Sequence, residues 1–267
     1  MSGPMVDLQA YLERIGYRGD LTPSYAVLEA LHLAHATHIP FENLDIQLGR
    51  PIHLDLEHLQ AKLIRAGRGG YCFEQNLLFA AVLEQLGFRL LRLAARVRYG
   101  TERTLPRTHM LLLVDVDGSR WLADVGFGAD GLLHPVPFDP GQISRQFLWS
   151  YRVIERSGVW ILQSIHDGSW VDLYGFTLEP QEQVDYEMAN HFTSTHPNSR
   201  FVQTLTAQFT SPQKRVTLRN RELVVDTGTA VTTRTLADDA EVLEVLSNVF
   251  NLPLPAGTQF KPPRNQA

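Results

Sequence analysis

The chain has a single cysteine, Cys72, and it lies where a thiol could serve as a nucleophile. Gly69 and Gly70 precede it and allow a sharp turn, and a helix is predicted to begin at or beside the cysteine. A helix N-terminus carries a partial positive charge, which favours a thiolate over a thiol. A lone cysteine can equally be a small buried hydrophobic residue, so its position alone leaves both interpretations open.

A nucleophilic thiol needs a base, and the base needs a group that orients it. Among ten histidines, His109 stands out because it opens the apolar strand predicted for residues 110–114. His32, His35 and His38 share one face of a predicted helix, and nothing nearby completes a metal site with recognisable spacing. We therefore interpret these three as ordinary face residues and expect no metal.

A predicted hairpin links His109 to a carboxylate. Asp117-Gly118 is typical of a two-residue turn, in which Val116 pairs with Ser119. This register puts His109 and Asp124 on one face as diagonal neighbours, about 7–8 Å apart at Cα. A four-residue loop would keep the shared face, whereas a three-residue loop would separate the two side chains. A solvated hairpin aspartate is the alternative, although the residues around Asp124 are mostly apolar.

The elements that must position these residues change in character along the chain. Helices are predicted for the first third, over residues 6–15, 24–38, 54–66 and 72–86. Strands are predicted for the middle third, over residues 90–97, 109–116, 120–125, 150–154 and 159–165. The last third is mixed, with strands at 216–218 and 223–225 and a helix at 237–249. The run from Leu77 to Leu83 is apolar all round, which predicts a buried helix.

The composition is that of an ordinary globular protein, with 44% apolar and 20% charged residues in 267. A net charge of −5 argues against a dedicated nucleic-acid binder but allows an anionic cofactor held by a few cations. No stretch approaches the roughly 18 apolar residues of a membrane span, and residues 1–7 lack the features of a secretory signal. One cysteine cannot form an internal disulfide, so a reducing cytoplasm is the expected setting.

With these motifs in place, the sequence resembles the arylamine N-acetyltransferases. Four segments are similar to family motifs and occur in the family's order: Ile39-Pro40-Phe41-Glu42-Asn43-Leu44; Arg68-Gly69-Gly70-Tyr71-Cys72-Phe73-Glu74-Gln75-Asn76; Thr108-His109 with Asp124-Val125-Gly126-Phe127-Gly128; and Thr193-Ser194-Thr195 with Pro197, Ser199 and Phe201. The segments span residues 39–201, and the order of helical, β-rich and mixed thirds agrees with the family.

The resemblance implies an α+β fold of three domains. These are a helical bundle (1–87) that carries the cysteine, a β-barrel (88–190) that carries His109 and Asp124, and an α/β lid (191–267) with a flexible C-terminal tail. The first two would form a core like that of papain-type cysteine enzymes. The family chemistry is a ping-pong transfer of acetyl from acetyl-coenzyme A to arylamines, arylhydrazines and related xenobiotics, through a Cys72–His109–Asp124 triad and an acetyl-cysteine thioester. The choice between monomer and homodimer is left open, and neither nucleic acid, membrane nor prosthetic group is expected as a partner.

The same resemblance implies two sets of binding residues. Those beside the coenzyme A thiol arm are Thr108, Gly126, Phe127, Arg200 and Phe201, and those around the aromatic acceptor are Phe41, Val97, Phe127 and Phe201. For each phenylalanine the alternative is plain core packing. Arg200 is next to Phe201 and could meet a phosphate, and a solvated arginine is the alternative. Glu42 and Arg68 lie in the two strongest motifs without a chemical step of their own, which suggests an ion pair that braces the cysteine loop.

Two other interpretations of the function remain. A cysteine hydrolase or a transglutaminase-like enzyme would have the same triad but would transfer the acyl group to water or to lysine. The segment from Thr193 to Phe201 and the lid domain argue against a simple hydrolase, which needs neither. A non-catalytic binding protein would be expected to lose one member of the triad, and here all three are present.

Overall fold

The computed structural model describes residues 5–128 and 130–261 of the chain. Its first part is helical, and the helices gather around α5 (Cys72–Gln85). The other elements of this part are α1 (Leu8–Arg14), α2 (Tyr25–His38), α3 (Leu44–Gln47), α4 (Leu56–Leu59) and the π-helical turn η1 (Gln60–Arg65). The helix predicted for 54–66 is thus two elements, α4 and η1. The second of them has i→i−5 hydrogen bonds, such as the one from the Ala66 amide to the Ala61 carbonyl.

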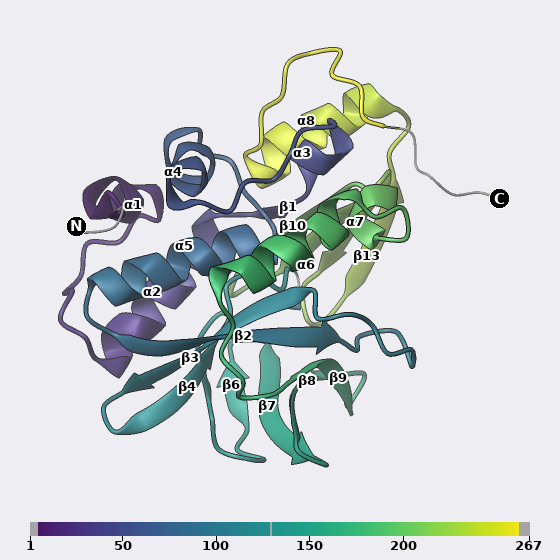
Figure 1. The fold of residues 1–267 in the computed structure, drawn as a ribbon. Coiled ribbons are helices and arrows are strands. Elements are labelled where there is room, and N and C mark those ends of the chain that lie inside the picture. The colour runs from purple at the N-terminus through teal and green to yellow at the C-terminus, as the bar shows by residue number, and fades with distance from the viewer. Residues whose placement is uncertain (1–4, 129, 262–267) are drawn as a thin grey trace.

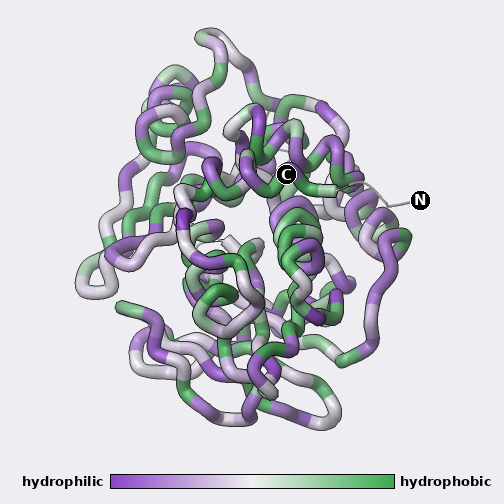
Figure 2. The backbone as a smooth tube through the Cα atoms, turned by 90° about the vertical axis from the view of Figure 1, so that its left-hand side faces the viewer, coloured by the Kyte–Doolittle hydropathy of each residue, from purple (hydrophilic) through white to green (hydrophobic). Residues whose placement is uncertain are grey.

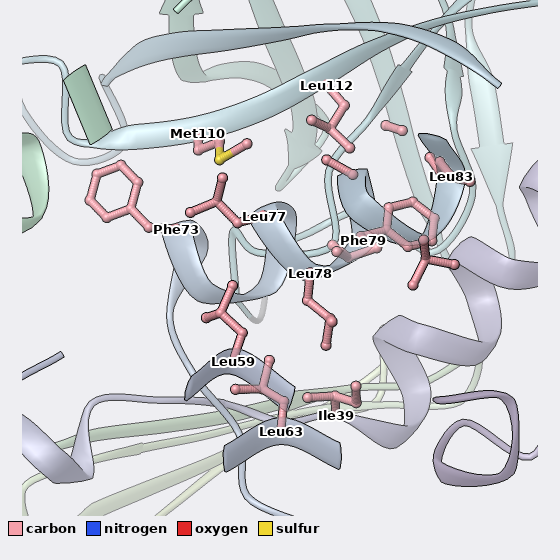
Figure 3. Close-up of a cluster of buried hydrophobic side chains, with 14 of the residues drawn as sticks. Ile39, Leu59, Leu63, Phe73, Leu77, Leu78, Phe79, Leu83, Met110 and Leu112 are labelled. Carbon is pink, nitrogen blue, oxygen red and sulfur yellow. The ribbon is translucent and has the colours of Figure 1, made fainter. Parts of the chain in front are cut away.

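Helix α5 is buried on all sides, as its apolar run predicts. Leu77 points toward Met110 and Leu112 of the neighbouring strand, whereas Leu78 points the opposite way, toward Ile39 and Leu63 (Figure 3). Because apolar residues occupy every face of this helix, it is held between the other helices and the sheet. The position of its first residue, Cys72, is therefore fixed by core packing.

The middle of the chain forms an antiparallel eight-stranded sheet, which curls into a nearly closed barrel below α2 and α5 (Figure 1). Its strands are β2 (Arg89–Val97), β3 (His109–Val116), β4 (Ser119–Ala123), β5 (Val136–Pro137), β6 (Ser144–Gln146), β7 (Trp149–Arg156), β8 (Val159–His166) and β9 (Ser169–Phe176), in the spatial order β5-β4-β3-β2-β9-β8-β7-β6. Strands β5, β6 and β9 were not predicted; the other five were.

Strand β3 is buried on both faces and so connects the two cores. Met110 and Leu112 pack in the cluster around α5, whereas Leu111 and Leu113 pack inside the barrel. Since side chains alternate along a strand, His109 points to the same side as Leu111. The histidine therefore enters the barrel face of the sheet.

The hairpin between β3 and β4 has the predicted two-residue turn. Asp117 and Gly118 have φ angles of 51° and 73°, and Val116 pairs with Ser119. The same register continues to the pair Leu112–Ala123, where the ladder ends. Asp124 follows immediately, on the side of the sheet that His109 occupies.

The last part of the chain builds a second sheet, in the order β1-β10-β11-β12-β13. Its elements are β1 (Phe41–Glu42), β10 (Thr206–Thr210), β11 (Arg215–Arg219), β12 (Glu222–Asp226), β13 (Val231–Thr235), and the helices α6 (Gln183–Thr195), α7 (Arg200–Gln203) and α8 (Asp239–Phe250). Strand β1 comes from the N-terminal motif, so the first and last parts of the chain share one sheet.

Hydrophobic and hydrophilic residues interleave along both helices and strands (Figure 2). In the described part of the chain, no helix is both long and apolar enough to cross a lipid bilayer. The division into domains at 87/88 and 190/191 stays a prediction. Of the tail, residues 253–261 have no regular secondary structure, and residues 262–267 lie outside the described ranges.

Candidate active site

Cys72 is the first residue of α5, and the turn before it is shaped by a close approach of two backbones. A Cβ on Gly69 would lie 2.1 Å from the Pro40 carbonyl oxygen, so only glycine fits there. Tyr71 caps the helix, and its amide donates to the Glu74 carboxylate at 3.0 Å. The cysteine is 3% exposed and its sulfur is 3.4 Å from the Thr108 carbonyl oxygen.

A buried cluster of charges braces this turn. Arg68 donates to Glu42 at 2.7 Å, which confirms the predicted ion pair, and it also reaches Asp45 at 3.3 Å. Lys62 completes the cluster with contacts of 2.8 Å to Asp45 and 2.7 Å to Glu74. The three carboxylates and two cations join β1, α3, η1 and the start of α5 into one unit.

His109 and Asp124 form a buried pair. The His109 Nε2 atom is 2.7 Å from Asp124 Oδ2, and the two side chains are 3% and 0% exposed. The other carboxylate oxygen of Asp124 accepts from Asn76 Nδ2 and from the Gly126 amide, both at 2.9 Å. Asn76 belongs to α5, so the helix that begins with the cysteine also holds the aspartate.

The charges of this pair stabilise each other. Burial lowers the pKa of His109, but the Asp124 charge, their hydrogen bond and the nearby Cys72 outweigh it and raise the pKa to about 10. Burial raises the pKa of Asp124, and the His109 charge and the hydrogen bonds lower it below its usual value. A carboxylate can only accept, so His109 Nε2 carries a proton and Nδ1 is left for Cys72. The arrangement can keep a protonated imidazole beside Cys72 at neutral pH.

His32 holds Asp124 from behind. The Asp124 amide donates to His32 Nε2 at 3.1 Å, and His32 Nδ1 donates to the Leu133 carbonyl at 3.0 Å. The ring is fully buried, and burial lowers its pKa to about 4. His32 is therefore neutral, with one nitrogen accepting and the other donating.

A cavity of about 640 Å³, including solvent at its mouth, opens in front of Cys72. His109, Thr108 and Gly126 line it beside the cysteine. Its apolar wall consists of Phe41, Val97, Phe127 and Phe201, and its polar wall includes Tyr99, Asp130, Arg200, Thr206 and Arg219. All the residues expected to bind coenzyme A or the acceptor thus line one cavity, whereas Asp124 lies behind it.

The comparisons with known proteins agree with this geometry. A family model described as N-acetyltransferase matches residues 24–259. An arylamine N-acetyltransferase of Mycobacterium tuberculosis is 40% identical over 253 residues, which are 92% of this chain and 89% of that protein. The chain belongs to the arylamine N-acetyltransferase family. The resemblance inferred from the motifs is confirmed.

Solved arylamine N-acetyltransferase structures have the same fold. The M. tuberculosis structure matches with a TM-score of 0.89 and 39% identity, covering 92% of this chain and 94% of that one. The Mycobacterium marinum structure, which is a complex with CoA, matches with a TM-score of 0.88 and 36% identity, covering 92% and 93%. The predicted α+β arylamine N-acetyltransferase fold is confirmed.

Gly126, a glycine of the third motif, lies too close to Cys72 to carry a side chain. A Cβ on Gly126 would lie 2.7 Å from the Cα of Cys72, so a larger residue would push the two segments apart. Phe127 follows and packs its ring edge-on to His109, with centroids 5.1 Å apart. Tyr174 covers the ring of His109 from another side at 4.7 Å. These contacts fix the imidazole plane.

Several residues around this arylamine N-acetyltransferase site have no counterpart in the sequence predictions. His32 was interpreted as a face residue, but its contact with the Asp124 amide ties it to the site. His35 is also buried, between Tyr11 and Gln75, and Gln75 in turn donates to the Gly70 carbonyl. A histidine next to apolar residues on a helix indicates a buried hydrogen-bond partner. Which residue is that partner depends on contacts between segments that are distant in sequence.

The described residues include one group whose potential ligand atoms lie within 4.8 Å of one another, His53, Asp55 and His58. All three are exposed, and none lines the cavity. The expectation that the catalytic site uses no metal stays a prediction.

Asp124→Asn should slow turnover by about 10³-fold or more, because it removes the charge that raises the pKa of His109. Less imidazolium then remains beside Cys72. Iodoacetamide alkylation of Cys72 at about pH 6 should therefore slow relative to alkylation at about pH 9. The exposed Asp115 of β3 supplies the matched control, Asp115→Asn. An unchanged ratio of the two rates in a folded Asp124→Asn protein would contradict the assignment.

His32→Gln should weaken the acid sensitivity of folding. His32 stays neutral in the folded protein down to about pH 4, whereas an ordinary histidine takes up a proton near 6.5, so stability is lost as the pH falls through this window. The substitution should lower the slope of unfolding free energy against pH by about 1 kcal/mol per pH unit between about pH 6 and 5. Urea unfolding at a series of pH values measures this slope.

The control for this measurement is His38→Gln, on the exposed end of the same helix, which should keep the wild-type slope. The shifted pKa of His109 changes stability with pH in the opposite direction from that of His32. With a folded pKa of about 10, its contribution to stability is complete below the ordinary value of 6.5 and is lost as the pH rises through about 10. A wild-type slope in His32→Gln would mean that folded His32 is protonated in this window.

Proposed function

We propose that this arylamine N-acetyltransferase family member transfers an acetyl group from acetyl-coenzyme A to the nitrogen of arylamines and arylhydrazines, with Cys72, His109 and Asp124 as its catalytic residues. The observation that carries the proposal is the placement of Cys72 at a helix N-terminus, in a cavity, beside an imidazole whose pKa is raised to about 10. Such a pair supplies a thiolate without an external base.

In the first half-reaction the Cys72 thiolate attacks the carbonyl carbon of the acetyl thioester. A bond forms between Cys72 Sγ and that carbon, and the bond to the coenzyme A sulfur breaks. His109 Nδ1 gives its proton to the departing sulfur, so coenzyme A leaves as a thiol and the histidine becomes neutral. Asp124 keeps the ring oriented through Nε2 throughout.

In the second half-reaction the acceptor nitrogen attacks the acetyl-cysteine. A carbon–nitrogen bond forms, the bond to Cys72 Sγ breaks, and His109 Nδ1 takes the proton that the nitrogen loses. The thiolate and imidazolium are thereby restored. A thioester is a suitable intermediate because it stays reactive toward amines.

The two substrates share the cavity in turn. We assign Thr108, Gly126, Phe127, Arg200 and Phe201 to the coenzyme A side, and Phe41, Val97, Phe127 and Phe201 to the acceptor side. The support is that all of them line the cavity that Cys72 opens into. The rings of Phe41 and Phe201 are 5.7 Å apart, and they offer an apolar surface to a flat ring.

The alternative of a cysteine hydrolase or transglutaminase-like enzyme would use the same triad. The family match over residues 24–259 favours acetyl transfer, because it includes the segments beyond the triad that build the cavity's polar wall. A cytoplasmic setting is part of the proposal, since a lone reactive cysteine must stay reduced. Whether the protein is a monomer or a homodimer stays open, and so does its expected independence of nucleic acid and membrane.

Incubation with acetyl-coenzyme A in the absence of an amine should give one acetyl adduct, on Cys72. The reason is that the first half-reaction does not need the acceptor. Intact mass followed by peptide mapping measures it, with Cys72→Ser as the control. An adduct on a lysine, or none on folded protein, would overturn the ping-pong proposal.

Anilines and hydrazines should be acetylated, whereas lysine-containing peptides should not. Aromatic amines are weak bases and remain unprotonated near neutral pH, whereas a lysine amine, with a pKa of about 10.4, is mostly protonated there. Chromatographic detection of the products measures both reactions in one assay. Efficient acetylation of the peptide would favour the transglutaminase-like alternative.

A further inference from the structure

The polar wall of the cavity contains two arginines without a carboxylate partner. Arg200 begins α7 and Arg219 ends β11, and both line the cavity that contains Cys72. Among residues 5–128 and 130–261, neither has a carboxylate oxygen within 4.0 Å. The acid on the same wall, Asp130, is already paired with Arg215 at 3.0 Å and lies 3.4 Å from His166.

A buried hydroxyl adds a second, independent observation. Thr206 is 1% exposed and lines the cavity, and its Oγ1 has no hydrogen-bond partner among the described residues. It is the direct cross-strand neighbour of Arg219 in the β10–β11 ladder, so the two side chains share one face of the sheet. Buried hydroxyls are normally bonded, which suggests that a ligand supplies the missing partner.

The electrostatics of the wall favour the binding of an anion. Burial lowers the pKa of Arg200, and the neighbouring charge of Arg219 lowers it further. Burial also raises the pKa of Tyr99 on the same wall, an effect that the charges of Arg219 and Arg200 oppose. Two like charges are thus held close enough to repel, and an oxyanion between them would relieve this repulsion.

We propose that Arg200, Arg219 and Thr206 form an oxyanion subsite of the catalytic cavity, which binds a phosphate of the acyl donor or a carboxylate carried by the aromatic acceptor. The two guanidinium groups can only donate hydrogen bonds, and the hydroxyl can donate a third, which suits either anion. The subsite rests on the proposed function, and it adds Arg219 and Thr206 to the binding residues assigned there.

The test compares charged and uncharged partners in matched pairs. Acetyl-coenzyme A is set against S-acetylpantetheine, which lacks the phosphates, and 4-aminobenzoate against 4-aminobenzamide. The variants are Arg219→Gln, Arg200→Gln and Thr206→Val, with Arg145→Gln on the surface strand β6 as the control. Thr206→Val keeps the shape of the side chain and removes only the unbonded hydroxyl, so it should not lower the melting temperature.

Each arginine variant should reduce kcat/KM for the charged member of one pair by about tenfold and leave its uncharged counterpart nearly unchanged. Thr206→Val should shift the same pair in the same direction. Selective loss with acetyl-coenzyme A identifies a donor phosphate as the ligand, and selective loss with 4-aminobenzoate identifies an acceptor carboxylate. The effect should shrink at high ionic strength, because the mouth is open to solvent.

Equal losses for charged and uncharged partners, or losses no larger than with Arg145→Gln, would overturn the subsite. This outcome is distinct from a failure of the proposed function. If the subsite alone is wrong, the unaltered protein still forms acetyl-Cys72 from both donors. If the proposed function is wrong, neither donor acetylates Cys72 in any variant.

Discussion

The His109 imidazolium and the Asp124 carboxylate have to remain charged in a buried site, and the arrangement of the other site residues depends on this pair. An imidazolium or a carboxylate loses most of its hydration on burial, and a single partner only partly compensates. Asp124 is therefore surrounded by donors: His109 on one oxygen, Asn76 and the Gly126 amide on the other. His32 accepts from the Asp124 amide, which keeps the carboxylate facing forward. The pair is stable as a unit, and removing either partner would leave an uncompensated buried charge.

The first turn of α5 connects this pair to Cys72. Glu74, Gln75 and Asn76 lie two to four residues after Cys72, and all three are buried. Glu74 binds the helix cap and Lys62, Gln75 binds backbone carbonyls of the preceding turn, and Asn76 binds Asp124. Each polar side chain is satisfied by a different neighbouring segment, so the helix can move only if all these bonds break. Packing of α5 against β3 then sets where Cys72 stands relative to His109.

The parts of this design that are local in sequence could be predicted. The hairpin turn at Asp117 follows from two residues, and its register alone predicts the face that His109 and Asp124 share. The pairing of β1 with β10 could not be predicted, because it joins segments that are far apart in the chain and a two-residue strand has no periodicity. The role of His32 depends on where β4 ends against α2, and the role of Thr206 depends on the β10–β11 register. Sequence patterns locate side chains on elements, whereas these roles arise from how the elements meet.

The sign of the charges in the cavity bears on which amines can react. In the proposed acetyl-enzyme Cys72 has no negative charge and His109 is neutral, and the acid of the wall, Asp130, is paired with Arg215. The remaining charges that line the cavity, on Arg200 and Arg219, are positive. A protonated alkylamine is repelled by such a wall, and its nitrogen has no lone pair with which to attack. With Phe41 and Phe201 assigned to the acceptor as proposed, a weakly basic aromatic amine would enter uncharged and pack against these rings. It would need to lose a proton only after the bond to carbon has begun to form. On this proposal the cationic wall and the aromatic wall would select the same class of amine for two different physical reasons.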